Sequence, residues 1–214
     1  MTDKLKKNNL EQFEILAVVL SAILKFIFVD WLDWRAFYIT GICLCWLGYI
    51  FYRINTKEGT LSLWGFKKEG FKQTVFILAP FIFLSIIASI LYSNLNNKLF
   101  FTWQIIPIFF LYPLWGIIQQ LLILGIFSHN LVSVLEIKIN RYVIIFLISG
   151  LFSLIHYPDF LLMGFTFIME LVFITVYLKW RNLLPIGIAH GWIATFLLYY
   201  VMERNLWAEL FSRF

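Results

Sequence analysis

The sequence predicts an all-α fold, a polytopic membrane bundle of about seven transmembrane helices with a cytoplasmic N-terminus. Of its 214 residues, 62% are hydrophobic and only 14% are charged, whereas a soluble domain carries about 25% charged residues. So much apolar surface exceeds what one soluble core can bury, which makes a bilayer the natural solvent. The apolar runs are continuous and do not alternate with polar residues, which favours helices over strands.

Seven apolar windows are long enough to cross a hydrocarbon core of about 30 Å, and they fall at about 13–29, 36–52, 74–93, 102–128, 142–157, 160–178 and 185–202. Basic residues precede the first window, but no small-residue cleavage site follows it, so we predict a membrane span and not a signal peptide. The connection at 55–73 is basic and amphipathic, which predicts an interfacial helix or hairpin on the cytoplasmic leaflet. Because no repeat or linker divides the chain, we expect residues 1–214 to form a single integral-membrane domain.

The distribution of basic residues predicts the orientation. Twelve Lys and Arg lie in the N-terminal tail and in the loops expected on its side of the membrane, against four in the other loops and the C-terminal tail. The positive-inside rule then puts the N-terminus in the cytoplasm and the C-terminus outside. These charges form no continuous stripe, so no nucleic-acid partner is expected. Cys43 and Cys45 would point to different faces of a helix, which argues against a disulfide or a metal pair.

Polar residues inside the predicted spans are the best indicators of function. Five of them fall in the inner helices: Gln119, Gln120, His156, Glu170 and His190. Each alone is compatible with interhelical hydrogen bonding, but adjacent amides on a helix point about 100° apart and cannot face one partner together. Two imidazoles and another polar side chain that converge in a bilayer would hold and activate water. From the residues alone, a transporter, a channel and an intramembrane enzyme all remain open.

Two stretches carry a family resemblance: "FSLIH" at 152–156 and "LKWRNLLPIGIAHGWIA" at 178–194. From about 61 to 196 the chain resembles the CAAX prenyl endopeptidase and bacteriocin-processing (Abi) family of intramembrane proteases, whose motifs are E-E-x-x-x-R, F-x-x-x-H and H-x-x-x-N. The second motif is complete at His156, and His190 is the histidine of the third. Gln119 and Gln120 stand where the family has its two glutamates. Leu124 and Ala194 replace the motif arginine and asparagine.

The resemblance implies catalytic positions at Gln119, Gln120, His156 and His190. In the family, the first glutamate is the general base, the motif-two histidine binds the water, and the third motif stabilises the oxyanion. Glutamine cannot accept a proton as a carboxylate does, so His156 or Glu170 would have to replace the base. Alternatively, the protein is a non-catalytic pseudoprotease that binds a membrane peptide or partner.

A metal held by His156 and His190 is disfavoured, since two imidazoles and amide oxygens fall short of a usual metal site, and no metal or cofactor is expected. A small proton-coupled transporter using Glu170 and the histidines is the least favoured alternative, because no inverted repeat is visible. The expected partners are the lipid bilayer and a membrane-embedded or lipidated peptide. We expect a multi-pass protein of the bacterial cytoplasmic membrane.

Overall fold

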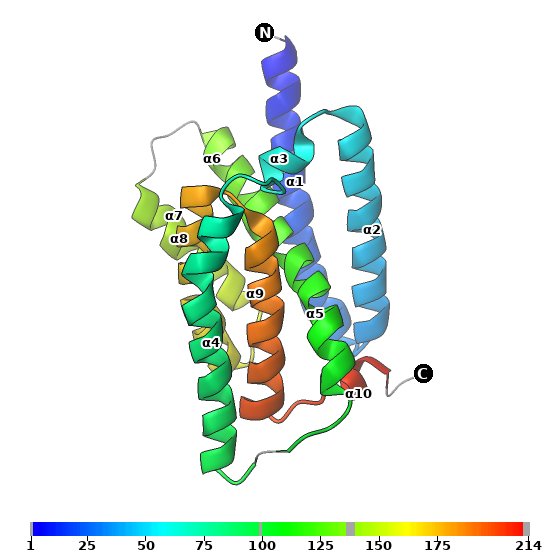
Figure 1. Cartoon of the computed structure of the whole chain (residues 1–214). Coiled ribbons are helices and arrows are strands. Elements are labelled where there is room, and N and C mark those ends of the chain that lie inside the picture. The colour runs from blue at the N-terminus through cyan, green and yellow to red at the C-terminus, as the bar shows by residue number, and fades with distance from the viewer. Residues whose placement is uncertain (1, 99, 136–139, 212–214) are drawn as a thin grey trace. The chain divides into compact units, whose positions relative to one another are not determined.

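The computed structural model describes residues 2–98, 100–135 and 140–211, and every regular element within them is helical (Figure 1). The predicted all-α class is confirmed. The chain divides into two compact units, which are described separately below. The first comprises Met1–Phe66 and Leu121–Arg181, and the second comprises Lys67–Gln120 and Asn182–Phe214.

Six helices in the described residues are long and apolar enough to cross a membrane: Asn8–Trp31, Arg35–Thr56, Phe71–Leu95, Ile105–Val134, Phe160–Trp180 and Leu183–Val201. A multi-pass membrane protein is therefore supported. The predicted window at 142–157 instead forms the shorter apolar helix Arg141–Leu154. Its 14 residues rise only about 21 Å, so six helices qualify by length where seven were predicted. The predicted orientation stays a prediction.

The short helix has clear local boundaries. Asn140 caps its start, because the Asn140 side chain accepts a hydrogen bond from the Tyr142 backbone N–H. At the other end the His156 N–H donates to the Ser153 carbonyl in a tight turn. Pro158 follows this turn and has no N–H with which to continue a helix. Window hydropathy does not register these signals, which is why the predicted span was too long.

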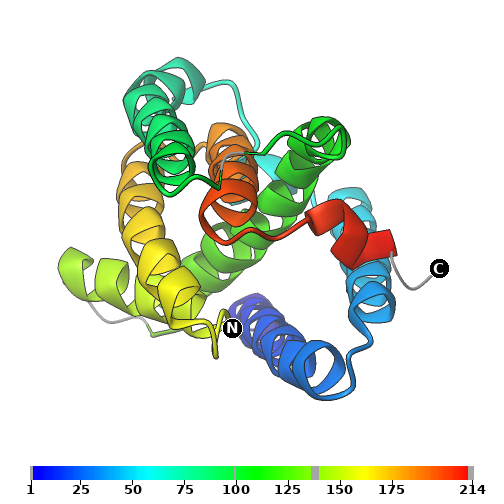
Figure 2. The ribbon, with the colours of Figure 1, turned by 90° about the horizontal axis from the view of Figure 1, so that it is seen from below.

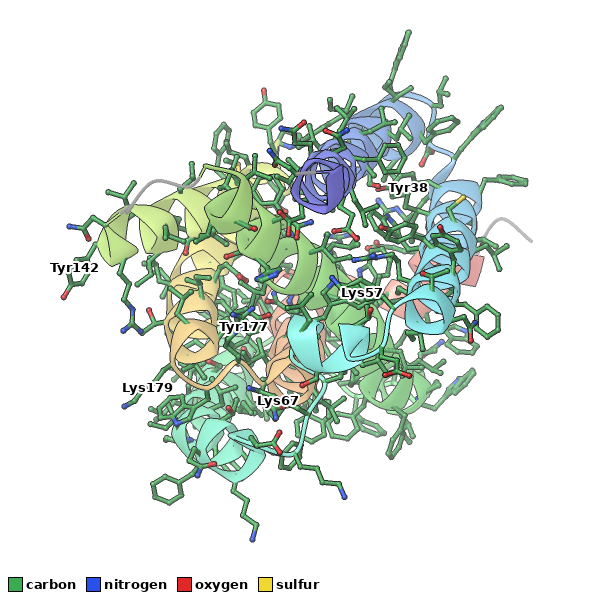
Figure 3. The ribbon with its side chains drawn as sticks, turned by 90° about the horizontal axis from the view of Figure 1, so that it is seen from above. Tyr38, Lys57, Lys67, Tyr142, Tyr177 and Lys179 are labelled. Atoms are coloured by element: carbon green, nitrogen blue, oxygen red, sulfur yellow. The ribbon has the colours of Figure 1, made fainter. Side chains whose placement is uncertain are left out.

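The first unit contains eight helical segments: α1 (Thr2–Lys25), η1 (Phe26–Trp31), α2 (Arg35–Thr56), α3 (Thr60–Trp64), η2 (Leu121–Ser128), α6 (His129–Leu135), α7 (Arg141–Leu154) and α8 (Phe160–Trp180). The η segments are π-helical. Helix α1 packs against η2 and α6, and α7 packs against α8 and η2, as the view from below also shows for α7 and α8 (Figure 2). Phe152, Phe173 and Leu124 are fully or almost fully buried. Tyr142 points outward on α7 (Figure 3).

The segment predicted to be interfacial forms the short helix α3. Gly59 and Gly65 flank it with φ of 76° and 99°, a conformation that glycine adopts without steric cost. Trp64 is only 1% exposed, and its carbonyl accepts a hydrogen bond of 3.1 Å from the Tyr177 hydroxyl. Arg181 Nη2 donates to the Leu63 carbonyl at 3.4 Å. Helix α3 is thus anchored to the end of α8, while its position in the membrane interface stays a prediction.

The second unit contains five helical segments: α4 (Phe71–Leu95), α5 (Ile105–Gln120), α9 (Leu183–Phe196), the π-helical η3 (Leu197–Val201) and α10 (Leu206–Phe211). Helix α9 packs against both α4 and α5. Phe109 of α5 stacks on Trp192 of α9 with ring centroids 5.4 Å apart and planes within 5°. In the connections, Lys98 Nζ lies 2.5 Å from a Glu203 carboxylate oxygen. The hydrogen bond to this carboxylate raises the pKa of Lys98.

Candidate functional site

Gln120 and His190 meet in the second unit. Gln120 is the last residue of α5 and His190 lies within α9, with 0% and 3% of their surfaces exposed. Gln120 Nε2 lies 3.0 Å from His190 Nδ1. An amide nitrogen carries only hydrogens, so it donates and Nδ1 accepts. With the amide in this orientation, the neutral imidazole carries its hydrogen on Nε2.

Close backbone packing between α5 and α9 makes this bond possible. A Cβ on Gly187 would lie 2.5 Å from Ile117 Cα, and a Cβ on Gly116 would lie 2.9 Å from the Gly191 backbone nitrogen. Only glycine fits at such contacts. Gly187 and Gly191 bracket His190 with the Gly-x-x-x-Gly spacing that is typical of tightly packed membrane helices. This spacing was the signal in the sequence that could have identified α9 as the partner of α5.

The two adjacent amides differ in their surroundings. Gln120 is fully buried and bonded to His190. Gln119 is half-buried. Since they point about 100° apart on the helix, the α5–α9 contact engages only the second amide. Gln119, and not Gln120, is at the predicted position of the family's general base, so the two amides need separate tests.

His156 lies in the first unit, in the turn that follows α7, and is half-buried. Its Nδ1 lies 3.0 Å from the Phe152 carbonyl oxygen. A carbonyl oxygen only accepts, so Nδ1 carries a hydrogen, and in the neutral form of the ring Nε2 carries the lone pair. The Phe152 ring also meets the imidazole edge-on, with centroids 5.1 Å apart. Phe152 thus orients His156 through both its backbone and its ring, which gives the F-x-x-x-H spacing a physical reason.

Glu170 also lies in the first unit. It is on α8 and is completely buried. Ionisable residues inside membrane helices are costly, which makes them functional candidates by default. In the same unit, His129 is half-buried and its Nδ1 accepts a hydrogen bond of 2.9 Å from Arg181 Nη2. This contact gives His129 a role in anchoring the end of α8.

The described residues contain no group of three or more His, Cys, Asp and Glu side chains that could hold a metal ion. Cys43 and Cys45 are both free thiols. His156, Glu170 and His190 carry acid–base groups, and Gln120 carries a hydrogen-bonding amide. In their neutral forms the two histidines have opposite hydrogen positions: His156 has an acceptor at Nε2, and His190 has a donor at Nε2.

Comparison with known proteins identifies the region that holds these residues. Residues 99–196 match the family model described as "Type II CAAX prenyl endopeptidase Rce1-like". All five predicted site residues lie inside the match, which begins at 99 and not near 61 as the sequence resemblance predicted. No curated protein and no solved structure matches the chain significantly. Residues 99–196 are thus similar to the Rce1-like type II CAAX prenyl endopeptidases, a family of intramembrane peptidases.

Proposed function

We propose that the protein is an intramembrane endopeptidase that cleaves membrane-embedded or lipid-modified peptides, with a base other than the family's glutamate. The proposal assigns catalysis to His156 and His190 and supporting roles to Gln119, Gln120 and Glu170. The observation that carries it is the different partner of each Nδ1: a carbonyl oxygen for His156 and an amide nitrogen for His190. In their neutral forms, His156 then has a lone pair at Nε2 and His190 an N–H. Peptide hydrolysis needs one group of each kind.

In the proposed reaction, His156 Nε2 accepts a proton from water while the water oxygen bonds to the carbon of the scissile amide. The electron pair of the C=O bond moves to the oxygen, and the Nε2–H of His190 stabilises the resulting negative charge. The C–N bond then breaks as His156 returns the proton to the leaving nitrogen. The products are an acid and an amine, and both histidines end as they began.

Three other residues support this chemistry in the proposal. Gln120 is a positioning residue, because its amide N–H fixes His190 as the Nε2–H tautomer. The side-chain oxygen of Gln119 can accept a hydrogen bond from the water but cannot take its proton. Glu170 is the second candidate base, since a carboxylate buried in a membrane helix can accept a proton that an amide cannot.

Cleavage of an S-farnesylated peptide that ends in Cys-Val-Leu-Ser, followed by mass spectrometry in proteoliposomes, tests the proposal. We expect His156→Ala to lower the cleavage rate about 10²–10⁴-fold, the usual contribution of a general base. We expect His190→Ala to lower it about 10²–10³-fold, as for loss of one oxyanion donor. Glu170→Gln tests the second candidate base. If Glu170 is the base, this variant loses cleavage, and if His156 is the base, it keeps cleavage. Unchanged cleavage by His156→Ala would exclude His156 as the base.

A non-catalytic pseudoprotease is the second candidate, and it is favoured by Gln119 and Gln120, which stand where the resemblance puts the family's two glutamates. This candidate predicts that the wild-type protein binds the farnesylated peptide without cleaving it. It also predicts that Gln119→Glu or Gln120→Glu, which restores a carboxylate, produces turnover. Turnover by the wild-type protein would exclude it.

A further inference from the structure

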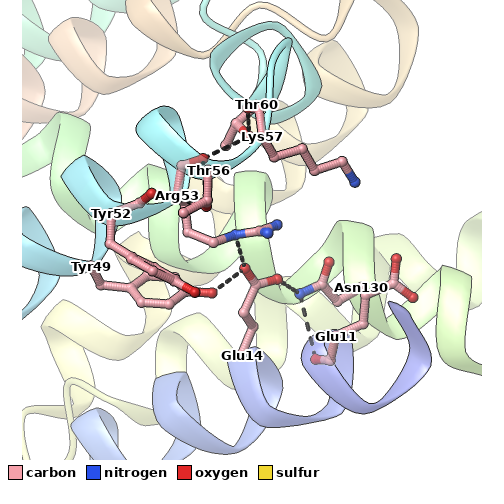
Figure 4. Close-up of polar contacts among 9 residues, drawn as sticks. All are labelled: Glu11, Glu14, Tyr49, Tyr52, Arg53, Thr56, Lys57, Thr60 and Asn130. Carbon is pink, nitrogen blue, oxygen red and sulfur yellow. Dashed lines mark hydrogen bonds and ion pairs between the residues drawn. The ribbon is translucent and has the colours of Figure 1, made fainter. Parts of the chain in front are cut away.

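A buried polar cluster lies in the first unit, where the middle of α1 meets the C-terminal end of α2 and the start of α6 (Figure 4). At its centre is Glu14, whose side chain is 1% exposed. Glu14 Oε1 accepts a hydrogen bond of 2.5 Å from the Tyr49 hydroxyl and lies 3.0 Å from Arg53 Nε. Oε2 accepts one of 2.5 Å from Asn130 Nδ2. Three donors thus satisfy this carboxylate, and three of the four residues lie outside the family match.

Arg53 is paired with Glu14 on one edge only. A guanidinium has five N–H donors, one on Nε and four on the two Nη atoms. The Nε edge faces Glu14, but in the part of the chain that the structure describes no acceptor bonds to either Nη. Figure 4 shows the Nη atoms turned away from Glu14. Although the residue is only 6% exposed, its Nη atoms are not fully buried, so the Nη edge is open to a small ligand.

The geometry of the open edge indicates the kind of ligand. Two Nη atoms form a planar fork that matches the two oxygens of a carboxylate. Glu14 takes up only the Nε edge and is itself held by Tyr49 and Asn130, so the Nη edge stays available to a second carboxylate. A phospholipid phosphate fits less well, because it is joined to a headgroup on one side and to a glycerol on the other. An arginine of which only 6% is exposed leaves little room for both. A carboxylate at the end of a chain needs only a narrow opening.

We propose that the Nη edge of Arg53 binds the free C-terminal carboxylate of a membrane-anchored peptide. Arg53 lies in the last turn of α2, where the end of a peptide with its lipid in the bilayer would meet the protein near the membrane boundary. A CAAX peptide carries such a free carboxylate a few residues beyond its lipidated cysteine. The inference rests on the proposed function and extends it, because it names the chemical group by which a substrate is held.

The experiment compares two peptides that differ at the chain end alone. An S-farnesylated peptide ending in Cys-Val-Leu-Ser is prepared with a C-terminal carboxylate and with a carboxamide, and binding to the full chain is measured in nanodiscs. All proteins carry His156→Ala, which is expected to slow turnover about 10²–10⁴-fold, and mass spectrometry checks that the peptide stays intact during the measurement. We expect the carboxylate form to bind at least about tenfold more tightly, as for a charge-assisted, bidentate pair. Equal binding of the two forms would overturn the proposal.

Variants assign the preference to Arg53. Arg53 cannot be removed alone without leaving Glu14 buried and unpaired, so Glu14→Gln is compared with the double change Glu14→Gln and Arg53→Gln. We expect Glu14→Gln to keep or strengthen the preference for the carboxylate and the double variant to abolish it. Lys57→Gln is the matched control, because it removes the same charge from an exposed position one turn further on. Each variant is checked for a cooperative thermal transition.

The remaining outcomes are decisive. A preference that survives in the double variant, or one that Lys57→Gln lowers equally, would overturn the assignment to Arg53. Competition by phosphatidylglycerol vesicles without any difference between carboxylate and amide would indicate a lipid phosphate and would also overturn it. Cleavage measured separately with His156 intact distinguishes the two proposals. Cleavage without a carboxylate preference defeats only the Arg53 site, and a preference without cleavage defeats only the enzymatic function.

Discussion

Two helix pairs in this protein use opposite means of association. Helices α5 and α9 approach until their backbones touch at Gly116, Gly187 and Gly191, with one buried side-chain hydrogen bond beside the contact. Helices α1 and α2 are joined mainly by long polar side chains. In the most apolar stretch of Leu183–Val201, 67% of the residues are buried. The corresponding share in α2 is 11%, and Trp46 and Arg53 are its two buried residues.

The difference teaches how each pair is stabilised in lipid. Apolar burial gives little drive for association in a bilayer, because lipid tails are as apolar as leucine. The α5–α9 pair therefore depends on close van der Waals contact, and the α1–α2 pair depends on polar bonds that lipid cannot replace. Stability of the first should respond to side-chain size, and stability of the second to charge and hydrogen bonding.

The largest expected effect is in the polar pair. Arg53→Met leaves Glu14 as an uncompensated buried charge, which should lower the free energy of unfolding by about 3–5 kcal/mol. Adding Glu14→Gln should recover most of the loss, since the pair is then removed together. SDS-induced unfolding in mixed micelles measures both variants. Equal instability of the single and double variants would contradict the ionic account of this pair.

The next effect is in the glycine pair. Gly191→Leu would push a side chain into Pro113, whose nitrogen lies 2.5 Å from the position of a Cβ on Gly191. We expect the helices to separate at a cost of about 1–3 kcal/mol, the usual penalty for overpacking, with loss of the Gln120–His190 bond. The same unfolding measurement applies, with Gly48→Leu as control, because a Cβ at Gly48 meets nothing within 4 Å. Equal effects of the two variants would argue against close packing as the cause.

A smaller effect on stability, with a specific signature, follows from Gln120→Leu. The change removes one buried interhelical hydrogen bond and should cost about 1–2 kcal/mol. It also removes the donor that fixes His190 as the Nε2–H tautomer, so the ¹⁵N resonances of that ring should change while those of His156 stay the same. An unchanged His190 spectrum would show that Gln120 does not control the tautomer.

The smallest expected effect is at the middle of the α1–α2 pair. Trp46 Nε1 donates a hydrogen bond of 3.0 Å to Ser21 Oγ. Trp46→Phe keeps an aromatic ring but removes this donor, and should cost about 0.6 kcal/mol, the average for such bonds between membrane helices. A loss as large as that of Arg53→Met would mean that ring volume and not the polar bond holds the pair.

The sequence predicted the helical class, the membrane location and the family because these follow from composition, long apolar runs and spaced motifs. It overestimated the helix that ends near Leu154, since hydropathy ignores the Asn140 cap and the turn before Pro158. By sequence alone, Arg53 falls among the loop cations from which the orientation in the membrane is predicted. The structure buries it against Glu14, 39 residues earlier in the chain, and positive-inside counting has no term for such pairing.

The candidate site likewise has one part that the sequence predicts and one part that it does not. The F-x-x-x-H spacing pointed to His156, and its bond to Phe152 is local enough to follow from the sequence. The bond between Gln120 and His190 joins residues 70 positions apart. It depends on which helices pack together, and only the Gly-x-x-x-Gly spacing indicated that. The roles of Gln119, Gln120, His156, Glu170 and His190 in catalysis stay predictions.

The π-helical segment Leu121–Ser128 changes how the first motif must be read. Its hydrogen bonds span five residues instead of four, so each turn holds more than 3.6 residues and the faces of the helix drift with every turn. A helical wheel drawn from Gln119 onward assigns the wrong sides to everything after Gln120. The face on which Leu124 lies, where the resemblance puts the motif arginine, therefore cannot be found by counting. A one-residue deletion that restored a regular helix would rotate Asn130 out of reach of Glu14.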